Sequence, residues 1–341
     1  MPEGDTIYRA SRALEKALGG RVVTAFETGL APLARVDDDA PIVGRTVVKV
    51  EARGKWCLIY FSARVGFGSA TPTSQNRNVG HPVVGAGPGD GGSIILVTHM
   101  LMSGSWHIYR TGEKWWMPRS KMRVAITCGE MQAVAFNVPI AEFHTERSLA
   151  RSSQVPKLGP DILSEGFTVD AGIAAMTQHA QQHPEAEVGV TLLNQRVMAG
   201  LGNVYKSEVA FAAGVHPFRR MSTFTAREIE RMVEASARYM RANVSEGSSA
   251  GATGAIVTYS GKRRTTHAMN SSDRLWVYGR EGEECRRCGA TILRRMQGTQ
   301  VRSTYWCPQC QPWLAAEGQN HEAPEGRALK RIGPGRRKIS C

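Results

Sequence analysis

Four cysteines near the end of the chain have the spacing of metal ligands. Cys285 and Cys288 are separated by two residues, as are Cys307 and Cys310, and about eighteen residues lie between the pairs. Such pairs form tight turns that present four thiolates to one zinc ion, and the closed shell leaves no position for water. We therefore expect one structural zinc ion and no catalytic metal. The residues alone also allow a disulfide-linked or metal-free unit.

The segment between the cysteine pairs carries side chains suited to phosphate. It contains Arg294, Arg295 and Arg302 together with several hydroxyl groups. A hairpin that presents guanidinium and hydroxyl groups can contact a DNA backbone, although a solvated basic hairpin would have the same composition. The formal net charge of +13 over 341 residues also favours a polyanionic partner, but it fits a merely basic protein too.

The first half of the chain predicts a helix followed by a β-rich scaffold. Apolar residues at helical spacing predict a helix that begins at Asp5 or Thr6 and stops at Gly19-Gly20. Strand patterns follow over residues 21–27, 46–51, 55–61, 93–99, 122–127 and 132–136. Residues 66–92 are rich in Gly, Pro, Ser and Asn, which predicts a surface insertion.

The second half predicts helices, with a glycine-rich turn at residues 199–203. Helical patterns cover residues 188–197, 205–213 and 226–242, and the basic, apolar-poor tail predicts disorder. We expect four parts: 1–150, 151–255, 256–311 and 312–341. No apolar run is long enough to span a membrane and the start lacks a signal-peptide pattern, so we expect an intracellular protein.

Four segments in order carry a resemblance to a known family. They are Met1-Pro2-Glu3-Gly4, Arg53-Gly54-Lys55, the run from Leu192 to Glu208, and the run from Gln300 to Gln311. Together they resemble the formamidopyrimidine-DNA glycosylase and endonuclease VIII family. The resemblance implies an α+β fold with a two-layered antiparallel β-sandwich and flanking helices, a helix–two-turns–helix domain, and a C-terminal zinc-finger β-hairpin. It also implies damaged double-stranded DNA as the partner, and we expect a monomer.

The resemblance implies a role for each matching residue. Pro2 would be the nucleophile after removal of Met1, and Glu3 would be the general acid and base. Lys55 would contact DNA phosphate beside the lesion and assist catalysis. His99 would contact a phosphate, and Met102 would be a wedge inserted into the DNA helix. Asn203 and Arg302 would contact the phosphates that flank the flipped nucleotide. The zinc ligands would be Cys285, Cys288, Cys307 and Cys310.

The chemistry of these residue types agrees with the implied roles. A chain-terminal amine titrates near pH 7.7–8.0, so part of it is neutral and nucleophilic at cellular pH. Attack on the deoxyribose C1′ would expel the base and leave an iminium, which acidifies the C2′ proton and permits β- and δ-elimination. The neighbouring carboxylate of Glu3 could transfer the protons.

Several alternatives remain open at this point. Met102 could pack in the core, and Glu208 could brace the glycine-rich motif. The start Pro-Glu-Gly-Asp-Thr is more like the endonuclease VIII branch, which favours oxidised pyrimidines and abasic sites as substrates. The same chemistry on 8-oxoguanine and formamidopyrimidines is the first alternative, and a non-catalytic zinc-containing nucleic-acid-binding protein is the second.

Overall fold

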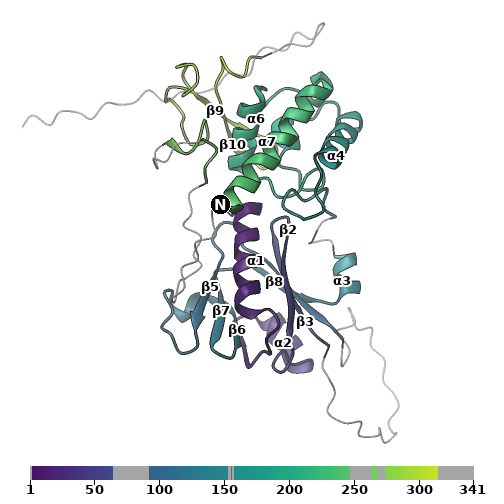
Figure 1. Cartoon of the computed structure of the whole chain (residues 1–341), viewed down its shortest axis with the longest axis vertical. Coiled ribbons are helices and arrows are strands. Elements are labelled where there is room, and N and C mark those ends of the chain that lie inside the picture. Colours follow the sequence, from purple (N-terminus) through teal and green to yellow (C-terminus); the bar gives the residue numbers. More distant parts are fainter. Residues whose placement is uncertain are drawn as a thin grey trace, which may run out of the picture. The chain divides into compact units, whose positions relative to one another are not determined.

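The computed structural model describes residues 2–63, 92–152, 155, 157–245, 263–266 and 273–313. The predicted insertion at 66–92 and the tail at 312–341 therefore lie largely outside the described residues, as do most of residues 256–272 in the third predicted part. Those that are described form two compact units, one ending at residue 155 and the other starting at residue 157 (Figure 1).

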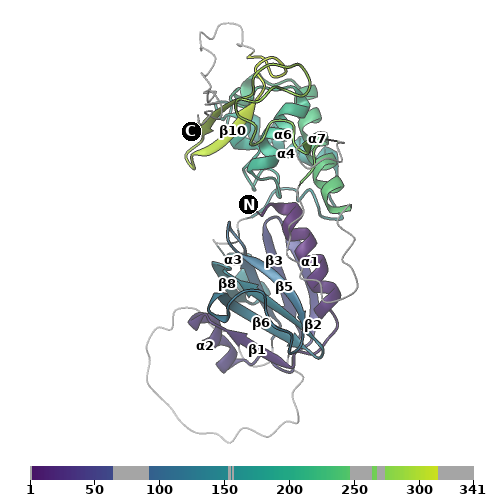
Figure 2. The same ribbon diagram turned by 90° about the vertical axis from the view of Figure 1, so that its left-hand side faces the viewer.

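The first unit is a sandwich of two four-stranded antiparallel sheets, as predicted. The strand orders are β2-β3-β4-β8 and β1-β6-β7-β5, and every neighbouring pair is antiparallel. Figure 2 labels β2, β3 and β8 of the first sheet and β1, β5 and β6 of the second. The strands are β1 (Ala25–Thr28), β2 (Val47–Arg53), β3 (Trp56–Phe61), β4 (Ile94–His99), β5 (Ser105–Arg110), β6 (Met122–Cys128), β7 (Met131–Phe136) and β8 (Ile140–His144). The accompanying helices are α1 (Gly4–Leu18), α2 (Ala31–Asp39), η1 (Arg119–Lys121) and α3 (Glu146–Arg151).

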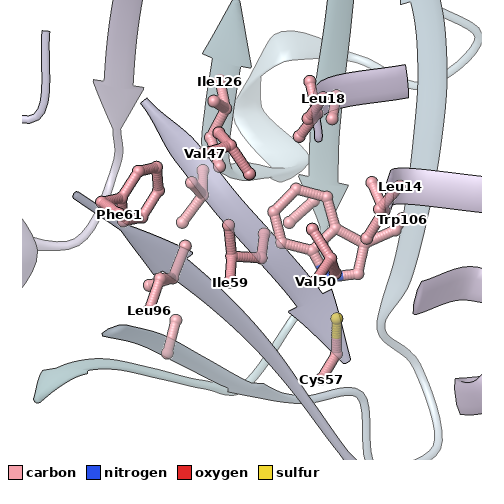
Figure 3. Packing of buried hydrophobic residues seen from close by; sticks show 14 of the residues in the cluster. Leu14, Leu18, Val47, Val50, Cys57, Ile59, Phe61, Leu96, Trp106 and Ile126 are labelled. Carbon is pink, nitrogen blue, oxygen red and sulfur yellow. The ribbon is translucent and has the colours of Figure 1, made fainter. Parts of the chain in front are cut away.

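Strand β3 shows how the sandwich forms from alternating residues. Cys57, Ile59 and Phe61 point into the core between the sheets, where Figure 3 shows them among side chains from both layers. Trp56 and Leu58 face the other way, into a smaller apolar cluster that includes a residue of α3. Both faces of β3 are thus buried because successive side chains alternate across a strand. Cys57 is a buried free thiol on the core face.

Helix α1 is held by both sheets. Its buried face includes Ile7 and Leu14, and it contacts β2 and β3 of one sheet and β5 and β7 of the other. The helix begins earlier than predicted, because the backbone N–H groups of Thr6 and Ile7 bond the carbonyl of Glu3 at 3.0 and 3.1 Å. Glu3 is therefore the N-cap, in place of Asp5 or Thr6, and its side chain makes no capping hydrogen bond.

The second unit combines helices with a two-stranded hairpin. The helices pack around one apolar core, to which α4, α6 and α7 all contribute. The elements are α4 (Val169–Gln182), α5 (Val188–Thr191), α6 (Asn203–Ala213), η2 (Met221–Thr223), α7 (Ala226–Ser245), β9 (Leu293–Gln297) and β10 (Arg302–Trp306). None of the helices in the described ranges has the length and apolar content needed to cross a membrane.

Two predicted elements are shorter than expected, each for a local reason. The helix predicted over 188–197 ends at Thr191, because Asn194 accepts a hydrogen bond from the Arg196 N–H at 3.0 Å and turns the chain. The strand predicted over 21–27 divides between the two sheets. Its first part bonds Arg45 through the Val23 N–H, and its last residues form β1 in the other sheet.

Candidate catalytic and DNA-binding site

The four cysteines lie close enough to bind one metal ion. Their sulfur atoms are all within 4.8 Å of one another, with Cys285 Sγ 3.8 Å from Cys310 Sγ and Cys288 Sγ 3.4 Å from Cys307 Sγ. Tetrahedral zinc with Zn–S bonds of about 2.3 Å requires sulfur separations of about 3.8 Å. The donor set therefore fits zinc, with all four ligands from the protein. The backbone N–H of Arg287 also points at Cys285 Sγ, at 3.4 Å, as expected where thiolate charge gathers.

The cysteine unit carries the β9–β10 hairpin, and Arg302 is the first residue of β10. Arg302 pairs with Gln297 across the hairpin, so the turn consists of residues 298–301. Val301 in this turn has a positive φ of 50° and is exposed. The guanidinium Nε and Nη2 of Arg302 both lie 3.4 Å from Gln300 Oε1. Arg302 thus stands half-buried where the turn enters the strand.

Asn203, the last residue of the predicted glycine-rich turn, begins α6. Gly200 has a φ of +108°, a conformation that side-chain-bearing residues rarely adopt, and this residue lets the chain reverse before the helix. The Asn203 Nδ2 donates to the carbonyl of Ser303 at 3.0 Å. Because Ser303 follows Arg302, the structure brings the two residues with implied phosphate roles to neighbouring positions. They are 99 positions apart in the chain, and nothing in the sequence pattern alone pairs them.

Glu208 on α6 is a further organising residue whose partners the sequence did not reveal. Its buried carboxylate accepts hydrogen bonds from the backbone N–H groups of Trp276, Val277 and Tyr278 at 2.8–2.9 Å, and from the Thr265 hydroxyl. Burial raises the pKa of Glu208, and the four hydrogen bonds oppose that rise. The residue braces segments on both sides of residues 267–272. Its hydrogen bonds go to these segments and not to the glycine-rich motif, which was the alternative that the sequence allowed.

Pro2 and Glu3 lie at the start of α1. Glu3 is fully buried, whereas Pro2 is partly exposed. The Glu3 carbonyl receives the first hydrogen bonds of the helix, so the backbone of the pair is fixed by the beginning of α1. The positive end of the helix dipole is also at this point. A nucleophile at Pro2 would therefore have a carboxylate as its covalent neighbour and a rigid helix as its support.

Lys55 occupies a two-residue hairpin turn between β2 and β3. Arg53 pairs with Trp56, so only Gly54 and Lys55 form the turn, and Gly54 has a φ of +58°. A glycine with positive φ in the first of two turn positions is typical of tight hairpins, and it fixes the residue that follows. Lys55 is half-buried at this turn.

His99 lies beside this hairpin at the end of β4. Its ring meets the Trp56 ring edge-on, with centroids 4.7 Å apart, and Trp56 pairs with His99 in the sheet. Burial, and secondly the charge of Lys55, lower the pKa of His99 to about 4. His99 Nδ1 accepts a hydrogen bond from the Leu101 N–H at 3.0 Å, so the proton of the neutral ring is assigned to Nε2. His99 can therefore donate to a phosphate without being charged.

The loop after β4 separates a buried methionine from an exposed one. Met100 is in the core, whereas Met102 is 71% exposed at the loop tip. Leu101 has a positive φ of 45°, and the Gly104 N–H bonds the Met100 carbonyl at 2.8 Å, which closes the loop. Core packing of Met102, the alternative that its sequence allowed, does not occur. Its role as a wedge stays a prediction.

The predicted site residues therefore form two groups, one in each compact unit. Lys55 and His99 lie together in the first unit, which also contains Pro2, Glu3 and Met102. The second unit brings Asn203 next to the strand that begins with Arg302, and it holds the four cysteines.

This architecture is similar to that of solved DNA glycosylases. The structure of the complex between the Lactococcus lactis Fpg and an abasic site containing DNA aligns with a TM-score of 0.66 and 20% identity, over 92% of this chain and all of that one. A structure of MutM in complex with carbocyclic 8-oxo-G containing DNA aligns with a TM-score of 0.65 and 19% identity, over the same shares of the two chains. At these identities the likeness shows the fold alone, which is that of the formamidopyrimidine-DNA glycosylases.

Sequence comparisons identify the family. The model for the formamidopyrimidine-DNA glycosylase N-terminal domain matches residues 1–139, and that for the H2TH domain matches residues 158–253. Probable endonuclease 8 2 of Streptomyces coelicolor is 31% identical over 91% of this chain and 94% of its own length. The DNA-(apurinic or apyrimidinic site) lyase Nei2 of Mycolicibacterium smegmatis is 30% identical, over 91% and 99%. A formamidopyrimidine-DNA glycosylase of Bacillus cereus is 27% identical, over 92% and 99%. The chain belongs to the formamidopyrimidine-DNA glycosylase and endonuclease VIII family.

Proposed function

We propose that this chain is a bifunctional DNA glycosylase and abasic-site lyase of base-excision repair, with Pro2 as its nucleophile. The observation that carries the proposal is the Pro2-Glu3 pair at the start of α1, with Glu3 fully buried, in a member of this family. A protein that only binds nucleic acid has no need of a proline amine at its terminus beside a buried carboxylate.

The first chemical step removes the base. After loss of Met1, the neutral amine of Pro2 attacks C1′ of the damaged nucleotide, and the bond from C1′ to the base breaks. The base leaves with the bonding electrons and takes up a proton. Glu3 protonates the sugar ring oxygen as the ring opens, which yields an iminium between Pro2 and C1′. Proton transfer by a positioned carboxyl contributes about 10²–10⁴-fold to a rate.

The second step cleaves the strand. The iminium withdraws electrons from the C1′–C2′ bond, so a base can remove a C2′ proton and the 3′ phosphate leaves with its bonding electrons. A second elimination expels the 5′ phosphate in the same way. Water then hydrolyses the iminium and releases the Pro2 amine. Glu3 is the group placed next to the amine to relay these protons.

The phosphates and the displaced base require separate contacts. We assign phosphate contacts to Lys55 and His99 in the first unit and to Asn203 and Arg302 in the second. An enzyme that acts on a base in duplex DNA must extrude it and fill the gap. The exposed Met102 at a closed loop tip has the shape and apolar character for that insertion. The cysteines would hold one zinc ion, which keeps the Arg302 hairpin folded.

Oxidised pyrimidines and abasic sites are the proposed substrates. The start of the chain supports the endonuclease VIII branch, and relatives named endonuclease 8 reach 31% identity, against 27% for a formamidopyrimidine-DNA glycosylase. Excision assays on duplexes with thymine glycol, dihydrouracil or 8-oxoguanine test this preference. Faster release of 8-oxoguanine than of both pyrimidines would assign the chain the alternative substrate class.

Borohydride reduction tests the proposed mechanism, because it converts a protein–DNA imine into a stable covalent adduct. The wild type should be trapped on abasic-site DNA, Pro2→Gly should be trapped poorly, and Glu3→Gln should lose base release. Protein with an uncleaved N-terminal extension should not be trapped. A wild type that binds abasic-site DNA and gives no adduct would show the non-catalytic binding protein instead.

A further inference from the structure

A buried lysine joins the two residues to which we assign phosphate contacts in the second unit. Lys206, one turn after Asn203 on α6, is fully buried. Its Nζ donates to the Ser303 carbonyl at 3.2 Å and to the Thr304 hydroxyl at 2.7 Å. The Ser303 carbonyl thus receives two donors from α6, because Asn203 Nδ2 binds the same oxygen. Burying an ammonium group is costly unless its N–H groups are hydrogen-bonded. These contacts therefore hold Lys206 Nζ in one position.

The hydrogen bonds continue from Lys206 through the hairpin in a single direction. The Thr304 hydroxyl donates to Gln297 Oε1 at 2.8 Å, and Gln297 Nε2 donates to Glu187 Oε2 at 2.8 Å. An ammonium group can only donate, so Thr304 must accept from Lys206 and pass its own proton to Gln297. This sets which end of the Gln297 amide faces the hydroxyl. This series of hydrogen bonds therefore has a single arrangement, with the Lys206 ammonium group at one end and the Glu187 carboxylate at the other.

This arrangement also fixes the orientations of Asn203 and Arg302, to which we assign phosphate contacts. The Ser303 carbonyl is an acceptor beside the Lys206 ammonium, so Asn203 can only approach it with its amide nitrogen. The second N–H on that nitrogen can then serve a phosphate oxygen. Arg302 and Thr304 lie on the same side of β10, because alternate residues share a face. Holding Thr304 against α6 therefore also sets the direction in which Arg302 leaves the strand.

We propose that Lys206 and Thr304 are positioning residues that set the spacing between Asn203 and Arg302 for two phosphates of the DNA backbone. The proposal rests on the proposed function, since it assumes that both residues contact DNA. Lys206 and Thr304 are both fully buried, so the proposal gives neither of them a contact with the substrate. Their effect on binding passes through Arg302, and this dependence distinguishes positioning from a general contribution to folding.

The experiment combines changes at Thr304 with removal of Arg302. Affinity for a duplex with a stable abasic-site analogue is measured for Thr304→Val, which loses the hydroxyl, and Thr304→Ser, which keeps it. The loss of one buried hydrogen bond predicts affinity weakened about tenfold for Thr304→Val and within about threefold of the wild type for Thr304→Ser. Ser236→Ala, which removes a buried hydroxyl on α7, is the matched control and should bind as the wild type.

The decisive comparison is made in the Arg302→Ala background. If Thr304 acts through Arg302, Thr304→Val should weaken binding by less than about twofold there, because coupled residues are not additive. The same tenfold loss in both backgrounds, or no loss in the wild-type background, would overturn the proposal. Lys206→Met removes both hydrogen bonds of the ammonium group, to Ser303 and Thr304, and must show the same dependence on Arg302. It provides a second variant if Thr304→Val does not fold.

Failure of this inference can be told apart from failure of the proposed function. Borohydride trapping of the wild type reports on the proline chemistry in the first unit, and the binding cycle reports on the second. A trapped wild type with additive losses refutes only the positioning role. An untrapped wild type with non-additive losses refutes the enzyme and leaves the positioning role in a DNA-binding protein.

Discussion

Replacing Glu208 with alanine should loosen the segment that carries Trp276, Val277 and Tyr278. The wild-type carboxylate accepts three consecutive backbone N–H groups of that segment and the hydroxyl of Thr265, and it is fully buried. Alanine leaves these donors without an acceptor. These donors belong to Thr265 and residues 276–278, so the substitution should first destabilise those two segments. The apolar core of the helices should remain in place.

The size of the effect follows from the number of donors. Leaving a buried donor without an acceptor costs about 1–3 kcal/mol of stability. Water that enters the volume left by the carboxylate can accept from the three amides, which lowers the cost of each to about 1 kcal/mol. Burial raises the pKa of Glu208, so removing the charge regains part of its desolvation cost, and the loss of the hydrogen bond from the Thr265 hydroxyl offsets that gain. We expect a loss of about 3 kcal/mol in local stability for Glu208→Ala. Glu208→Gln, which keeps the shape and one acceptor, should lose less.

Hydrogen exchange measures this loss directly. The amides of Trp276, Val277 and Tyr278 should exchange about 100-fold faster in Glu208→Ala, as about 3 kcal/mol requires. Glu234→Ala, at an exposed position of α7, is the control and should leave their exchange unchanged. Exchange of these three amides at the wild-type rate in Glu208→Ala would show that the Glu208 carboxylate does not brace the segment.

Three further predictions concern the DNA contacts, the metal and a titration. Arg302→Ala should weaken DNA binding and reduce the slope of log K against log salt by about one unit, and an unchanged slope would remove its phosphate contact. Removing zinc with a chelator should unfold the β9–β10 hairpin and leave the β-sandwich intact, as seen by hydrogen exchange; retention of hairpin protection without metal would contradict a structural zinc ion. The His99 ring should titrate near pH 4 by nuclear magnetic resonance, because burial and the Lys55 charge disfavour its charged form. Lys55→Met removes the charge, which is the smaller of the two causes, so the pKa of His99 should rise and remain below 6.5. An unchanged pKa would show that the Lys55 charge does not act on His99.

Local patterns in the sequence predicted the parts of the site that depend on neighbouring residues. The spacing of Cys285 and Cys288 already specifies a metal-binding turn, and the structure places all four thiols within ligand distance. The apolar periodicity after Glu3 predicted α1. The apolar run of β3 likewise predicted a strand. Each of these features is determined within a few turns of chain.

The remaining features depend on contacts between distant residues. Asn203 binds a carbonyl 100 positions away, and Glu208 binds amides about 70 positions away. No periodicity encodes such pairs, since any buried acceptor would satisfy the donors. The strand predicted over 21–27 failed for a related reason, because its β pattern was correct but the segment passes from one sheet to the other. The exposure of Met102 and burial of Met100 were also undetermined, since the two residues have the same chemistry.

Mapping the trapped DNA adduct tests the central claim most directly. The wild type is reduced with borohydride on abasic-site DNA, digested, and sequenced by tandem mass spectrometry. The proposed mechanism predicts that the sugar remnant lies on the amine of Pro2, in a chain from which Met1 has been removed. An adduct on a lysine side chain, or no adduct from protein that binds the DNA, would contradict the N-terminal nucleophile.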